Sequence, residues 1–530
     1  MKPHSATDDG GGQYAATRFL TRPESYGART PVEVIETHIS RIFLVGERAY
    51  KMKRAVLLPY VDFSTPQARL SACRKEVTLN SRTAPDLYLG ARRVTATPDG
   101  GLEFDGKGAL VDAVVEMKRF DQSCLLDRRA EAGDLTPRLM TEVARAILRF
   151  HESAPVVHAG GGADNIAGVL DINEAGFATS QLFLPGAVAA LGARFRATLA
   201  RRAALLDARE TAGKVRRCHG DLHLRNICVL DGVPCLFDCI EFNDQIATVD
   251  VLYDLAFLLM DLWHRGHRGL ANLVMNRYFD AQDEEDGFVL LPFFMAVRAA
   301  VRAHVTATQF EEGGRENRAL ADEAQSYFDL AGALLDEPPA RLIAIGGLSG
   351  SGKTTVAEAL AAYVGAPPGA RILESDRLRK AMHNVAPETR LPGEAYSPEI
   401  SARVYADMAR RSRSLLAEGG AVVADAVFDR SDDRARIRQC ARDTATPFAG
   451  VWLDVGATLL RHRVSERTTD GPSDATVAVL AGQLRRQRDD IEWTKVDATR
   501  PPERIVADIL AMPGAESRPD HDTVRTGTRG

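Results

Sequence analysis

The chain has 530 residues, with 67 lysines and arginines against 72 aspartates and glutamates, so its formal net charge is −5. At about 100–200 residues per domain, this length predicts several folded domains. The balanced charge offers no broad basic surface, which argues against nucleic acid and anionic membranes as partners.

The N-terminal residues and the cysteines indicate the compartment. Residues 1–12 are polar and glycine-rich, without the apolar core of a signal peptide, and no apolar run reaches the ~18 residues of a membrane span. The 7 cysteines are scattered and odd in number, as expected of reduced thiols. We therefore expect a cytoplasmic protein, and the sequence does not indicate its oligomeric state.

A small β-rich lobe is predicted over residues 31–120, after a polar segment at residues 1–30. Apolar alternation between residues 37 and 53 predicts two strands around a turn at Gly46. The apolar strand at residues 113–120 runs into a polar stretch. It suits a hinge whose backbone meets an adenine edge, although an ordinary core strand fits the same residues.

Two lysines of this lobe are candidates for contact with a nucleotide. Lys51 and Lys53 lie on one face of the second strand, and Glu76 lies on a helix predicted over residues 69–81. A strand lysine held by a helix carboxylate neutralises phosphate charge in nucleotide-binding lobes. Two solvated lysines on an edge strand are the alternative, but the loop at residues 219–226 favours the nucleotide role.

A helical lobe is predicted over residues 121–335, with apolar residues spaced for one helix face from Leu139 onward. Within it, residues 219–226 read His-Gly-Asp-Leu-His-Leu-Arg-Asn, and Asp238 ends the next apolar run. Phosphorylation of a hydroxyl needs one aspartate to accept the alcohol's proton, and an amide and a carboxylate to hold magnesium on the nucleotide phosphates. Asp221 is the candidate base, and Asn226 and Asp238 are the candidate metal ligands.

Other polar residues around this loop allow structural interpretations. Three cysteines and a histidine could form a metal site, but a buried strand in which cysteine acts as a small apolar residue is the better explanation; these residues are Cys228, Cys235, Cys239 and His223. Asp254, on an apolar helix that follows, could brace the loop. Acids at a helix start are also favoured by the helix dipole alone, and we assign Asp250 to that role.

A third domain is predicted over residues 340–512, because Pro338 and Pro339 end the helical pattern. A short apolar strand at residues 341–345 leads into the pattern G-x-x-x-x-G-K-[ST] and then into a helix, the context that identifies a phosphate-binding loop. Its glycines let backbone N–H groups curl around phosphate oxygens. The candidate nucleotide-binding residues are Gly347, Ser349, Gly350, Ser351, Gly352, Lys353, Thr354 and Thr355.

The chemistry of this third domain is assigned to four residues. Lys353 is expected to reach the terminal phosphates and Thr354 to ligate magnesium, and Asp425, which ends an apolar strand, completes the predicted magnesium site. Asp376 follows the strand at residues 371–373 at the sheet edge where ligands bind, so it is placed to orient an acceptor hydroxyl.

Several arginines of the third domain have two interpretations each. Arg377 and Arg379 either hold an anionic substrate or form a solvated helix face. Arg467 lies on a basic helix predicted over residues 459–468, and either closes over the phosphates as part of a mobile lid or belongs to an exposed charged helix. Residues 513–530 are expected to form a disordered tail.

The first half resembles the aminoglycoside phosphotransferase family, small-molecule relatives of protein kinases, through the loop at residues 219–226 and Asp238, and more weakly through Lys51 with Glu76. This resemblance implies an α+β, bilobal, protein-kinase-like domain. It also implies that Asp221 is the catalytic base and that Lys51 pairs the phosphates, with Lys53 the second candidate. One departure is that residues 40–46 hold a single glycine, so no glycine-rich loop covers the phosphates.

The second half resembles P-loop small-molecule kinases of the gluconate kinase, chloramphenicol phosphotransferase and zeta-toxin type, through its phosphate-binding loop, Asp376 and Asp425. Arg467 falls where such kinases carry lid arginines. This resemblance implies an α/β P-loop NTPase domain with a parallel sheet. The tandem as a whole resembles bacterial proteins described as bifunctional aminoglycoside phosphotransferase and ATP-binding proteins.

The leading hypothesis is a bifunctional enzyme in which each half transfers the γ-phosphoryl group of ATP or GTP, with Mg²⁺, to a small hydroxylated molecule. A regulatory protein is the first alternative, in which one half phosphorylates and the other senses nucleotide. A non-catalytic nucleotide-binding scaffold is the second.

Overall fold

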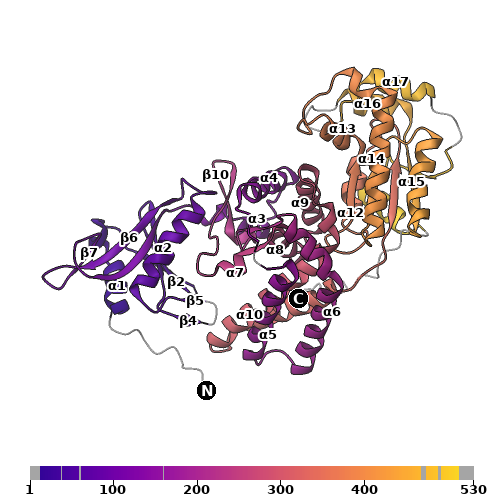
Figure 1. Ribbon diagram of the computed structural model, residues 1–530. Helices are drawn as coiled ribbons and strands as arrows, with labels where there is room; N and C mark the ends of the chain where they lie inside the picture. The colour runs from indigo at the N-terminus through magenta and orange to yellow at the C-terminus, as the bar shows by residue number, and fades with distance from the viewer. Residues whose placement is uncertain are drawn as a thin grey trace, which may run out of the picture. The chain divides into compact units, whose positions relative to one another are not determined.

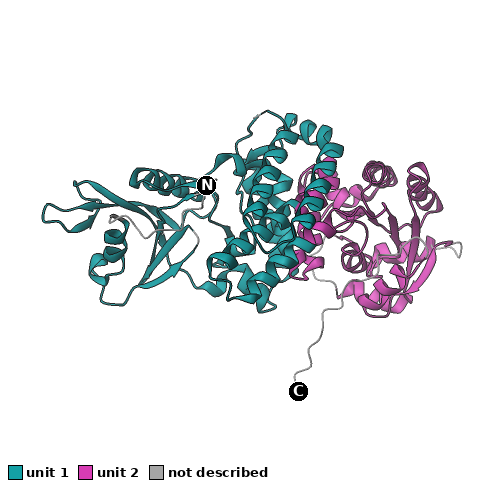
Figure 2. Ribbon diagram, turned by 90° about the horizontal axis from the view of Figure 1, so that it is seen from below, with its two compact units in different colours: residues 1–261, 297–329 teal, residues 262–296, 330–530 magenta. Residues whose placement is uncertain are grey.

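The computed structural model describes residues 12–37, 39–58, 61–158, 160–466, 473–486 and 491–512. The chain forms two compact units, coloured in Figure 2. The first comprises residues 1–261 and 297–329, and the second comprises residues 262–296 and 330–530.

The small lobe of the first unit is an antiparallel sheet of six strands in the order β1-β2-β3-β8-β6-β7 (Figure 1). The two strands expected around Gly46 are β2 and β3, so this prediction is confirmed. The strands are β1 (Glu33–Glu36), β2 (Ser40–Val45), β3 (Arg48–Lys53), β6 (Tyr88–Ala96), β7 (Leu102–Phe104) and β8 (Leu110–Lys118), and a separate short pair is β4 (Leu57–Leu58) with β5 (Val61–Asp62).

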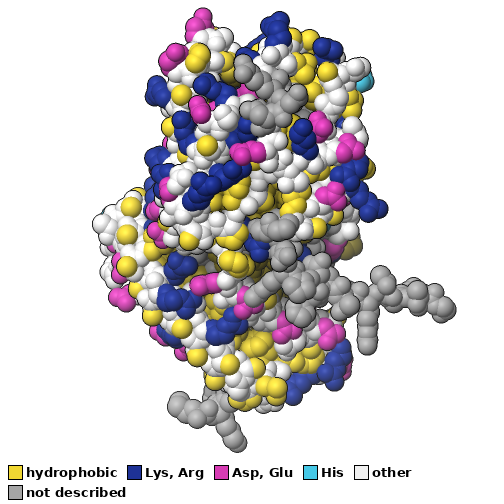
Figure 3. Space-filling view, turned by 90° about the vertical axis from the view of Figure 1, so that its right-hand side faces the viewer, with side chains coloured by type: hydrophobic (Ala, Val, Ile, Leu, Met, Phe, Trp, Pro, Cys, Tyr) yellow, Lys and Arg dark blue, Asp and Glu magenta, His cyan; other side chains and the backbone are white. Residues whose placement is uncertain are grey.

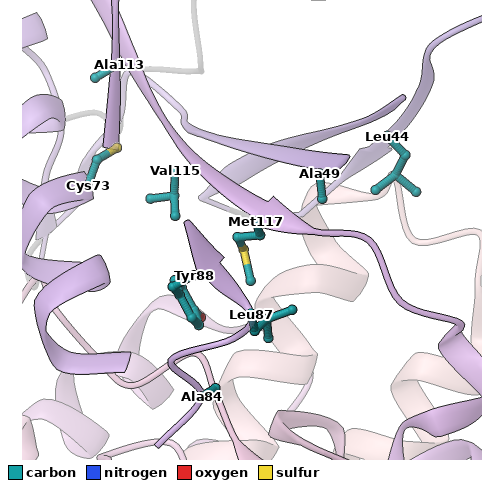
Figure 4. Packing of buried hydrophobic residues seen from close by; sticks show 9 residues of the cluster. All are labelled: Leu44, Ala49, Cys73, Ala84, Leu87, Tyr88, Ala113, Val115 and Met117. Atoms are coloured by element: carbon teal, nitrogen blue, oxygen red, sulfur yellow. The ribbon is translucent and has the colours of Figure 1, made fainter. Parts of the chain in front are cut away.

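Both faces of this sheet are covered. Helix α2 (Pro66–Asn80) packs on one face over an apolar cluster drawn in Figure 4, which includes Leu87, Val115 and Met117. Helix α1 (Gly12–Leu20) buries its Ala16 and Leu20 completely in a second cluster, and a short 3-10 helix, η1 (Pro23–Tyr26), follows it. Part of the predicted polar segment at residues 1–30 is therefore a folded helix, because these apolar side chains cover the sheet.

Helices make up most of the rest of the first unit. The helix predicted from Leu139 is α4, which begins earlier, at Pro137, because the Thr136 side chain accepts a hydrogen bond from the Leu139 N–H. The longer helices are α3 (Leu126–Glu131), α4 (Pro137–Ser153), α5 (Gly162–Thr179), α6 (Pro185–Thr211), α8 (Val251–His264), α10 (Leu291–Glu312) and α11 (Arg318–Leu334). Helices α8, α10 and α11 each carry residues of both units.

Short elements among these helices shape the loop at residues 219–226. Strands β9 and β12 pair before and after it, and β10 and β11 form the hairpin that follows it. These elements are η2 (Gln122–Cys124), β9 (Val215–Arg217), η3 (Leu224–Asn226), β10 (Ile227–Leu230), β11 (Val233–Leu236), α7 (Asp244–Ala247) and β12 (Thr248–Asp250).

The second unit is built on a five-stranded parallel sheet in the order β14-β15-β13-β16-β17. Its strands are β13 (Leu342–Gly346), β14 (Arg371–Glu374), β15 (Val422–Asp425), β16 (Phe448–Asp454) and β17 (Thr494–Asp497). Its helices are α12 (Lys353–Ala361), α13 (Ser375–Met382), α14 (Pro398–Ala417), α15 (Ser431–Asp443), α16 (Ala457–Ser465), α17 (Val477–Arg486) and α18 (Pro502–Leu510), with η5 (Gly393–Tyr396). The predicted fold class, a bilobal kinase-like domain followed by a P-loop domain with a parallel sheet, is confirmed.

A segment from the predicted helical lobe belongs to the second unit. Residues 262–296, with helix α9 (Arg268–Ala281) and the 3-10 helix η4 (Glu285–Leu290), make their contacts with α12, α13 and α14. The compact units therefore divide the chain differently from the single boundary predicted at Pro338 and Pro339. The apolar spacing in the sequence predicted helices in this segment, but it did not predict that they pack on helices of the P-loop domain.

A buried polar network joins this segment to the sheet. Arg371 of β14 is 1% exposed, and its guanidinium contacts Asp280 (Nη1–Oδ1, 2.7 Å), Glu285 (Nε–Oε1, 2.9 Å) and Asn276 (Nη1–Oδ1, 2.9 Å). Arg411 of α14 also pairs with Glu285. Burial raises the pKa of Asp280, but Arg371 and its neighbours lower it further, so this carboxylate stays ionised and the network stays charged.

Surface charge and helix composition complete the description. On the face drawn in Figure 3, basic and acidic side chains are interspersed rather than gathered in patches of one sign. One helical segment, Glu285–Glu312, is long and apolar enough to cross a membrane by length and composition, but 67% of its most apolar window is buried inside the protein. Core helices of globular proteins have the same properties.

The buried network predicts a large loss of stability when Arg371 is removed. We expect Arg371→Met to lower the free energy of unfolding of the second unit by about 3–5 kcal/mol, because it removes the fully buried cation that two carboxylates, Asp280 and Glu285, share. Tryptophan fluorescence during urea unfolding measures this unit, since Trp263, Trp452 and Trp493 all belong to it.

Arg413→Met is the matched control. Arg413 pairs with Asp443 at 3.0 Å, and both side chains are largely exposed. An exposed pair contributes under about 1 kcal/mol, so equal losses in the two variants would contradict a structural role for the buried network.

Candidate active sites

A cavity of ≈ 890 Å³ in the first unit brings together residues that lie far apart in the sequence. Lys51 from β3, Asp221 and Asn226 from the loop at residues 219–226, and Asp238 after β11 all line it. Four of the predicted site residues therefore line one open cavity. The loop at residues 219–226 is called the catalytic loop below.

The two lysines of β3 have different partners. Lys51 Nζ lies 2.9 Å from Glu76 Oε1 and also contacts Asp238. Lys53 is 1% exposed and is held between Glu76 and Glu241. The structure thus places Lys51, and not Lys53, beside the predicted metal ligand, and the assignment of Lys51 to the phosphates stays a prediction.

Electrostatics keep this cluster ionised. Burial lowers the pKa of Lys51, but Asp238 and Glu76 raise it by more, so the net pKa is raised. Burial raises the pKa of Asp238, but Lys51 and Lys53 outweigh this effect and the net pKa is lowered. Asp238 is therefore a carboxylate ready to bind a cation.

The backbone adopts positive φ at two positions of the first site, Gly220 in the catalytic loop and Asp238 after β11. Gly220 has φ 85°, and a Cβ there would lie 3.0 Å from the Ala247 Cβ, so glycine is required at this close approach. Asp238 adopts φ 65°, which is uncommon for a residue other than glycine and is typical of functional sites.

Asp221 and Asn226 contact each other directly. Asn226 Nδ2 donates to Asp221 Oδ2 at 2.8 Å and to the Asp221 carbonyl at 2.9 Å, which leaves Asn226 Oδ1 as the atom that can ligate a cation. Burial raises the pKa of Asp221, but the interactions of its carboxylate with His223, whose Nε2 lies 3.4 Å from Asp221 Oδ2, lower the pKa by more. Asp221 is therefore ionised and can accept a proton. An amide oxygen with an ionised carboxylate fits Mg²⁺.

Asp254 braces the catalytic loop. Its carboxylate accepts hydrogen bonds from the backbone N–H of His219 (3.1 Å) and Gly220 (2.8 Å), and contacts His151 Nε2 (3.1 Å). Arg298 Nη1 donates to the Gly220 carbonyl at 2.9 Å. The bracing role considered for Asp254 is therefore what the geometry shows.

Asp250 has a structural role. It forms a buried double hydrogen bond with Arg209 (2.7 and 2.9 Å), and it also accepts from the Leu252 N–H at the start of α8. The assignment of Asp250 to the helix start agrees with this geometry.

Two backbone N–H groups at the predicted hinge already donate hydrogen bonds within the protein. The N–H of Lys118 donates to the Leu87 carbonyl and that of Arg119 to the Glu47 carbonyl, each at 2.9 Å. A nucleotide base at this position therefore cannot use these two donors while the bonds persist. The hinge role stays a prediction.

The metal site considered for Cys228, Cys235, Cys239 and His223 is not formed. Cys228 and Cys235 face each other across the β10–β11 hairpin, in agreement with the strand interpretation. Within the described part of the chain, the group whose ligand atoms lie close enough for an ion is His151, Cys218 and Asp254. That group is buried and its carboxylate already holds the catalytic loop, so we assign it no metal.

The phosphate-binding loop of the second unit has the expected strand–loop–helix context. Helix α12 begins at Lys353, directly after Gly352, which adopts φ 91° and makes no side-chain capping bond. Its first N–H groups are thus left for an anion. Gly347 adopts φ 152°, and a Cβ there would meet Ser351 Oγ at 2.6 Å, so the loop requires glycine. Thr355 lies in the first turn of α12, as the predicted set requires.

Three oxygen-bearing side chains meet beside this loop. Thr354 Oγ1 donates to Asp425 Oδ2 at 2.8 Å and lies 3.4 Å from Glu374 Oε1. Burial raises the pKa of Asp425 to about 6, and burial together with Asp425 raises that of Glu374 to about 8. A hydroxyl and two crowded carboxylates fit a divalent cation, which would favour their charged forms.

Glu374 is the residue of this site that the sequence reasoning did not single out. It pairs in register with Asp425 on the neighbouring parallel strand, and the carboxyl ends of parallel strands lie at one sheet edge. Glu374 directly follows the predicted strand at residues 371–373, so the sequence could have indicated it as a ligand in the same way as Asp425.

Other residues of the phosphate-binding loop are held by contacts with the loop itself and with helices that follow it in the chain. Lys353 Nζ lies 3.3 Å from the Leu348 carbonyl, and the Ser349 N–H donates to Gln483 Oε1 at 2.9 Å. The hydroxyl of Ser351 is buried and has no hydrogen-bond partner among the described residues. Gly350, which adopts φ 87°, approaches the backbone of α16.

The structure shows the surroundings of the residues predicted to bind the acceptor, Asp376, Arg377 and Arg379. Asp376 is half-buried in the first turn of α13. Arg377 pairs with Glu374 (2.9 Å) and Asp280 (3.4 Å), and the buried Arg379 donates to the Ala395 carbonyl (2.8 Å). The interpretation of these two arginines as a solvated helix face is therefore wrong, because both are held by buried acceptors.

The basic helix predicted over residues 459–468 corresponds to α16 (Ala457–Ser465), but the candidate lid arginine lies beyond its end, outside the described residues. Arg467 belongs to residues 467–472, and the predicted tail, residues 513–530, likewise lies outside them. Asp474, just after this gap, contacts Lys380 (3.1 Å), Tyr396 Oη (2.6 Å) and the Leu391 N–H (2.9 Å).

Comparison with known families matches both halves of the chain. Residues 115–288 match the model described as the phosphotransferase enzyme family (APH), and residues 342–489 match an AAA domain model. The predicted resemblance of both halves is confirmed at this level. The matches support phosphotransfer and nucleotide binding as the chemistry of the chain.

One relative is similar to most of this chain, and two solved structures are each similar to a part of it. An uncharacterized protein of Mycobacterium tuberculosis H37Rv is 28% identical over 484 residues, covering 90% of this chain and 94% of the relative. A choline/ethanolamine kinase family protein from Mesorhizobium loti is 16% identical, covering 62% of this chain and 95% of that structure, with TM-score 0.40. A gluconokinase from Sinorhizobium meliloti is 24% identical, covering 32% and 89%, with TM-score 0.23.

The contacts of Lys51 and Lys53 predict separable defects. In a Lys353→Ala background that silences the second site, Lys51→Met should weaken binding of magnesium-ATP at least about tenfold, since it removes a charged contact. Equilibrium binding of a fluorescent ATP analogue measures this loss.

Lys53→Met should act mainly on stability, because it leaves Glu76 and Glu241 buried with one cation fewer. Native-state hydrogen exchange of β3 should increase more in this variant than in Lys51→Met. The reverse ranking in both measurements would show that Lys53 is the phosphate-pairing lysine.

Proposed function

We propose that the chain is a bifunctional ATP-dependent phosphotransferase, in which each unit transfers the γ-phosphoryl group to a hydroxyl of a small molecule. The observation that supports this proposal is that Lys51, Asp221, Asn226 and Asp238 line one cavity in the first unit, and that Thr354 contacts Asp425 beside the phosphate-binding loop in the second. GTP is an alternative donor, and a cytoplasmic location remains our expectation.

In the first unit, Asp221 accepts the proton as the acceptor's O–H bond breaks. The new bond joins the acceptor oxygen to the γ-phosphorus, and the bond from this phosphorus to the bridging oxygen breaks to leave ADP. Lys51 binds phosphate oxygens, and Glu76 orients the lysine. Asp254 keeps the catalytic loop in place through two backbone hydrogen bonds.

In the second unit, the backbone N–H groups of the phosphate-binding loop hold the nucleotide phosphates, and Lys353 reaches the terminal ones. Asp376 orients the acceptor hydroxyl. Magnesium, when bound, neutralises charge on the phosphates. Asn226 and Asp238 would hold it in the first unit, and Thr354 and Asp425 would hold it in the second.

One observation favours a second candidate function, in which the P-loop unit regulates the first. Helix α10 begins at Leu291, in the segment that belongs to the second unit, and carries Arg298, which contacts the Gly220 carbonyl. A single helix thus contains residues of both units. Nucleotide occupancy of the second unit could bias the catalytic loop through it.

Separate inactivation of the two sites tests the proposal. We expect Asp221→Asn to reduce phosphorylation by the first unit by about 10²–10⁴-fold, the usual contribution of a general base, without changing the second. Lys353→Ala should abolish only the activity of the second unit. Transfer of labelled phosphate from ATP into a pool of hydroxylated metabolites measures both activities.

The same experiment separates the candidate functions. If Lys353→Ala also abolishes transfer by the first unit while ATP still binds there, regulation replaces bifunctional catalysis. If the wild-type protein labels no metabolite, catalysis by both units is refuted.

A further inference from the structure

The charges of the residues on the helical side of the first unit's cavity indicate which kind of acceptor it can bind. The small lobe carries Lys51 and the predicted nucleotide site, so the acceptor is left with the wall formed by the catalytic loop and helices α5, α8 and α10. This set of lining residues is called the acceptor wall. Its residues include Val169, Ile172, Asn173, Arg225, Tyr253, Phe257, Arg298, Val301, Arg302, His304, Val305, Gln309 and Glu312.

Cations outnumber anions on the acceptor wall. Three arginines, Arg225, Arg298 and Arg302, stand against one acid, Glu312, if the catalytic Asp221 is left aside. His304 adds no charge near neutral pH, because burial lowers its pKa to about 4. The rest of the wall is apolar or neutral. A polycationic acceptor would therefore meet repulsion here, while an anion would be attracted.

Arg302 is the central cation of this wall. It lies one helical turn beyond Arg298 on α10, keeps 28% of its side chain exposed, and lines the same cavity as Asp221. Its salt bridge with Glu323 is long, at 4.0 Å. An arginine near the catalytic base, with a loosely held carboxylate partner, can bind a carboxylate or phosphate on a substrate.

Arg225 and Arg298 extend this positive charge. Arg225 is an exposed residue of the catalytic loop, directly before Asn226. Arg298 is buried, stacks at 3.9 Å on the Tyr253 ring, and its Nη2 lies 3.7 Å from Asp254 Oδ1, so its charge is partly compensated. The cations come from two separate elements, the catalytic loop and α10, that line the same cavity as Asp221.

We propose that the acceptor of the first unit is a small hydroxylated anion, whose carboxylate or phosphate group is bound by Arg302 and Arg225 while its hydroxyl faces Asp221. This inference rests on the proposed phosphotransfer by that unit. It specifies a sugar acid, hydroxy acid or phosphorylated polyol, and it excludes polyamine-bearing sugars as preferred acceptors.

Matched acceptors test the charge requirement in the Lys353→Ala chain, which leaves only the first unit active. The probes are three-, five- and six-carbon polyols, each with its sugar acid, its sugar phosphate and its amino sugar. We expect kcat/KM for the best acid or phosphate to exceed that of its neutral counterpart by at least about tenfold, the effect of one charged hydrogen bond. The acid and phosphate arms identify which anion is bound.

Variants of Arg302 distinguish binding from support of the fold. Arg302→Gln should erase the preference for the anion over the neutral polyol, mainly through KM, and Arg302→Lys should restore part of it. Arg318→Gln is the control, because Arg318 is an exposed arginine of the same unit outside the cavity. A loss of activity that is equal for anionic and neutral acceptors would assign Arg302 a structural role and overturn the proposal.

Calorimetric binding to the Asp221→Asn, Lys353→Ala chain separates this proposal from the proposed function. Binding of anionic probes that depends on Arg302, without transfer in the Lys353→Ala chain, would keep the anion site and refute phosphotransfer. Preferred transfer to neutral or amino acceptors would keep phosphotransfer and overturn the anion site. Absence of binding by every anionic probe would also overturn it.

Discussion

The carboxylate of Asp254 is the contact on which the first site depends. It accepts hydrogen bonds from two successive backbone N–H groups, and it is itself held by His151. A buried carboxylate that satisfies two amides fixes the path of the backbone, because an alternative path would leave these groups unpaired at a cost of about 1–3 kcal/mol each. Asp221 and Asn226 follow within six residues, so their positions depend on this anchor.

The two sites handle phosphate charge by different means. The first uses side chains from separate lobes, and its two lysines share the buried carboxylate of Glu76. The second uses the backbone, since a glycine-rich turn leads into the uncapped start of α12. The first arrangement depends on long-range packing, whereas the second is formed almost entirely within eight consecutive residues. This difference explains why the second was the more specific motif in the sequence.

Segment 262–296 is part of the second unit, although it precedes that unit's sheet by many residues in the sequence. Its α9 and η4 place Asn276, Asp280 and Glu285 around the buried Arg371, so the P-loop unit needs residues that precede its family match. Asp280 also contacts Arg377, which pairs with Glu374 beside the predicted magnesium ligands. Loss of Asp280 would therefore leave Arg371 in the sheet and Arg377 beside the site each with one carboxylate partner fewer. Removing a partner from a buried charge is strongly destabilising.

The sequence by itself determined the local features of this protein. Strand, loop and helix signals placed the phosphate-binding loop, the catalytic loop and the acids Asp238 and Asp425 correctly, because backbone geometry and residue type act over a few neighbours. Only the tertiary structure decided that Lys51 rather than Lys53 meets Asp238, that Glu374 and Asp425 both lie beside Thr354, and that Arg302 lines the same cavity as Asp221. These pairings join residues up to 187 positions apart. They depend on which faces pack together, and periodicity along one element carries no information about its partner.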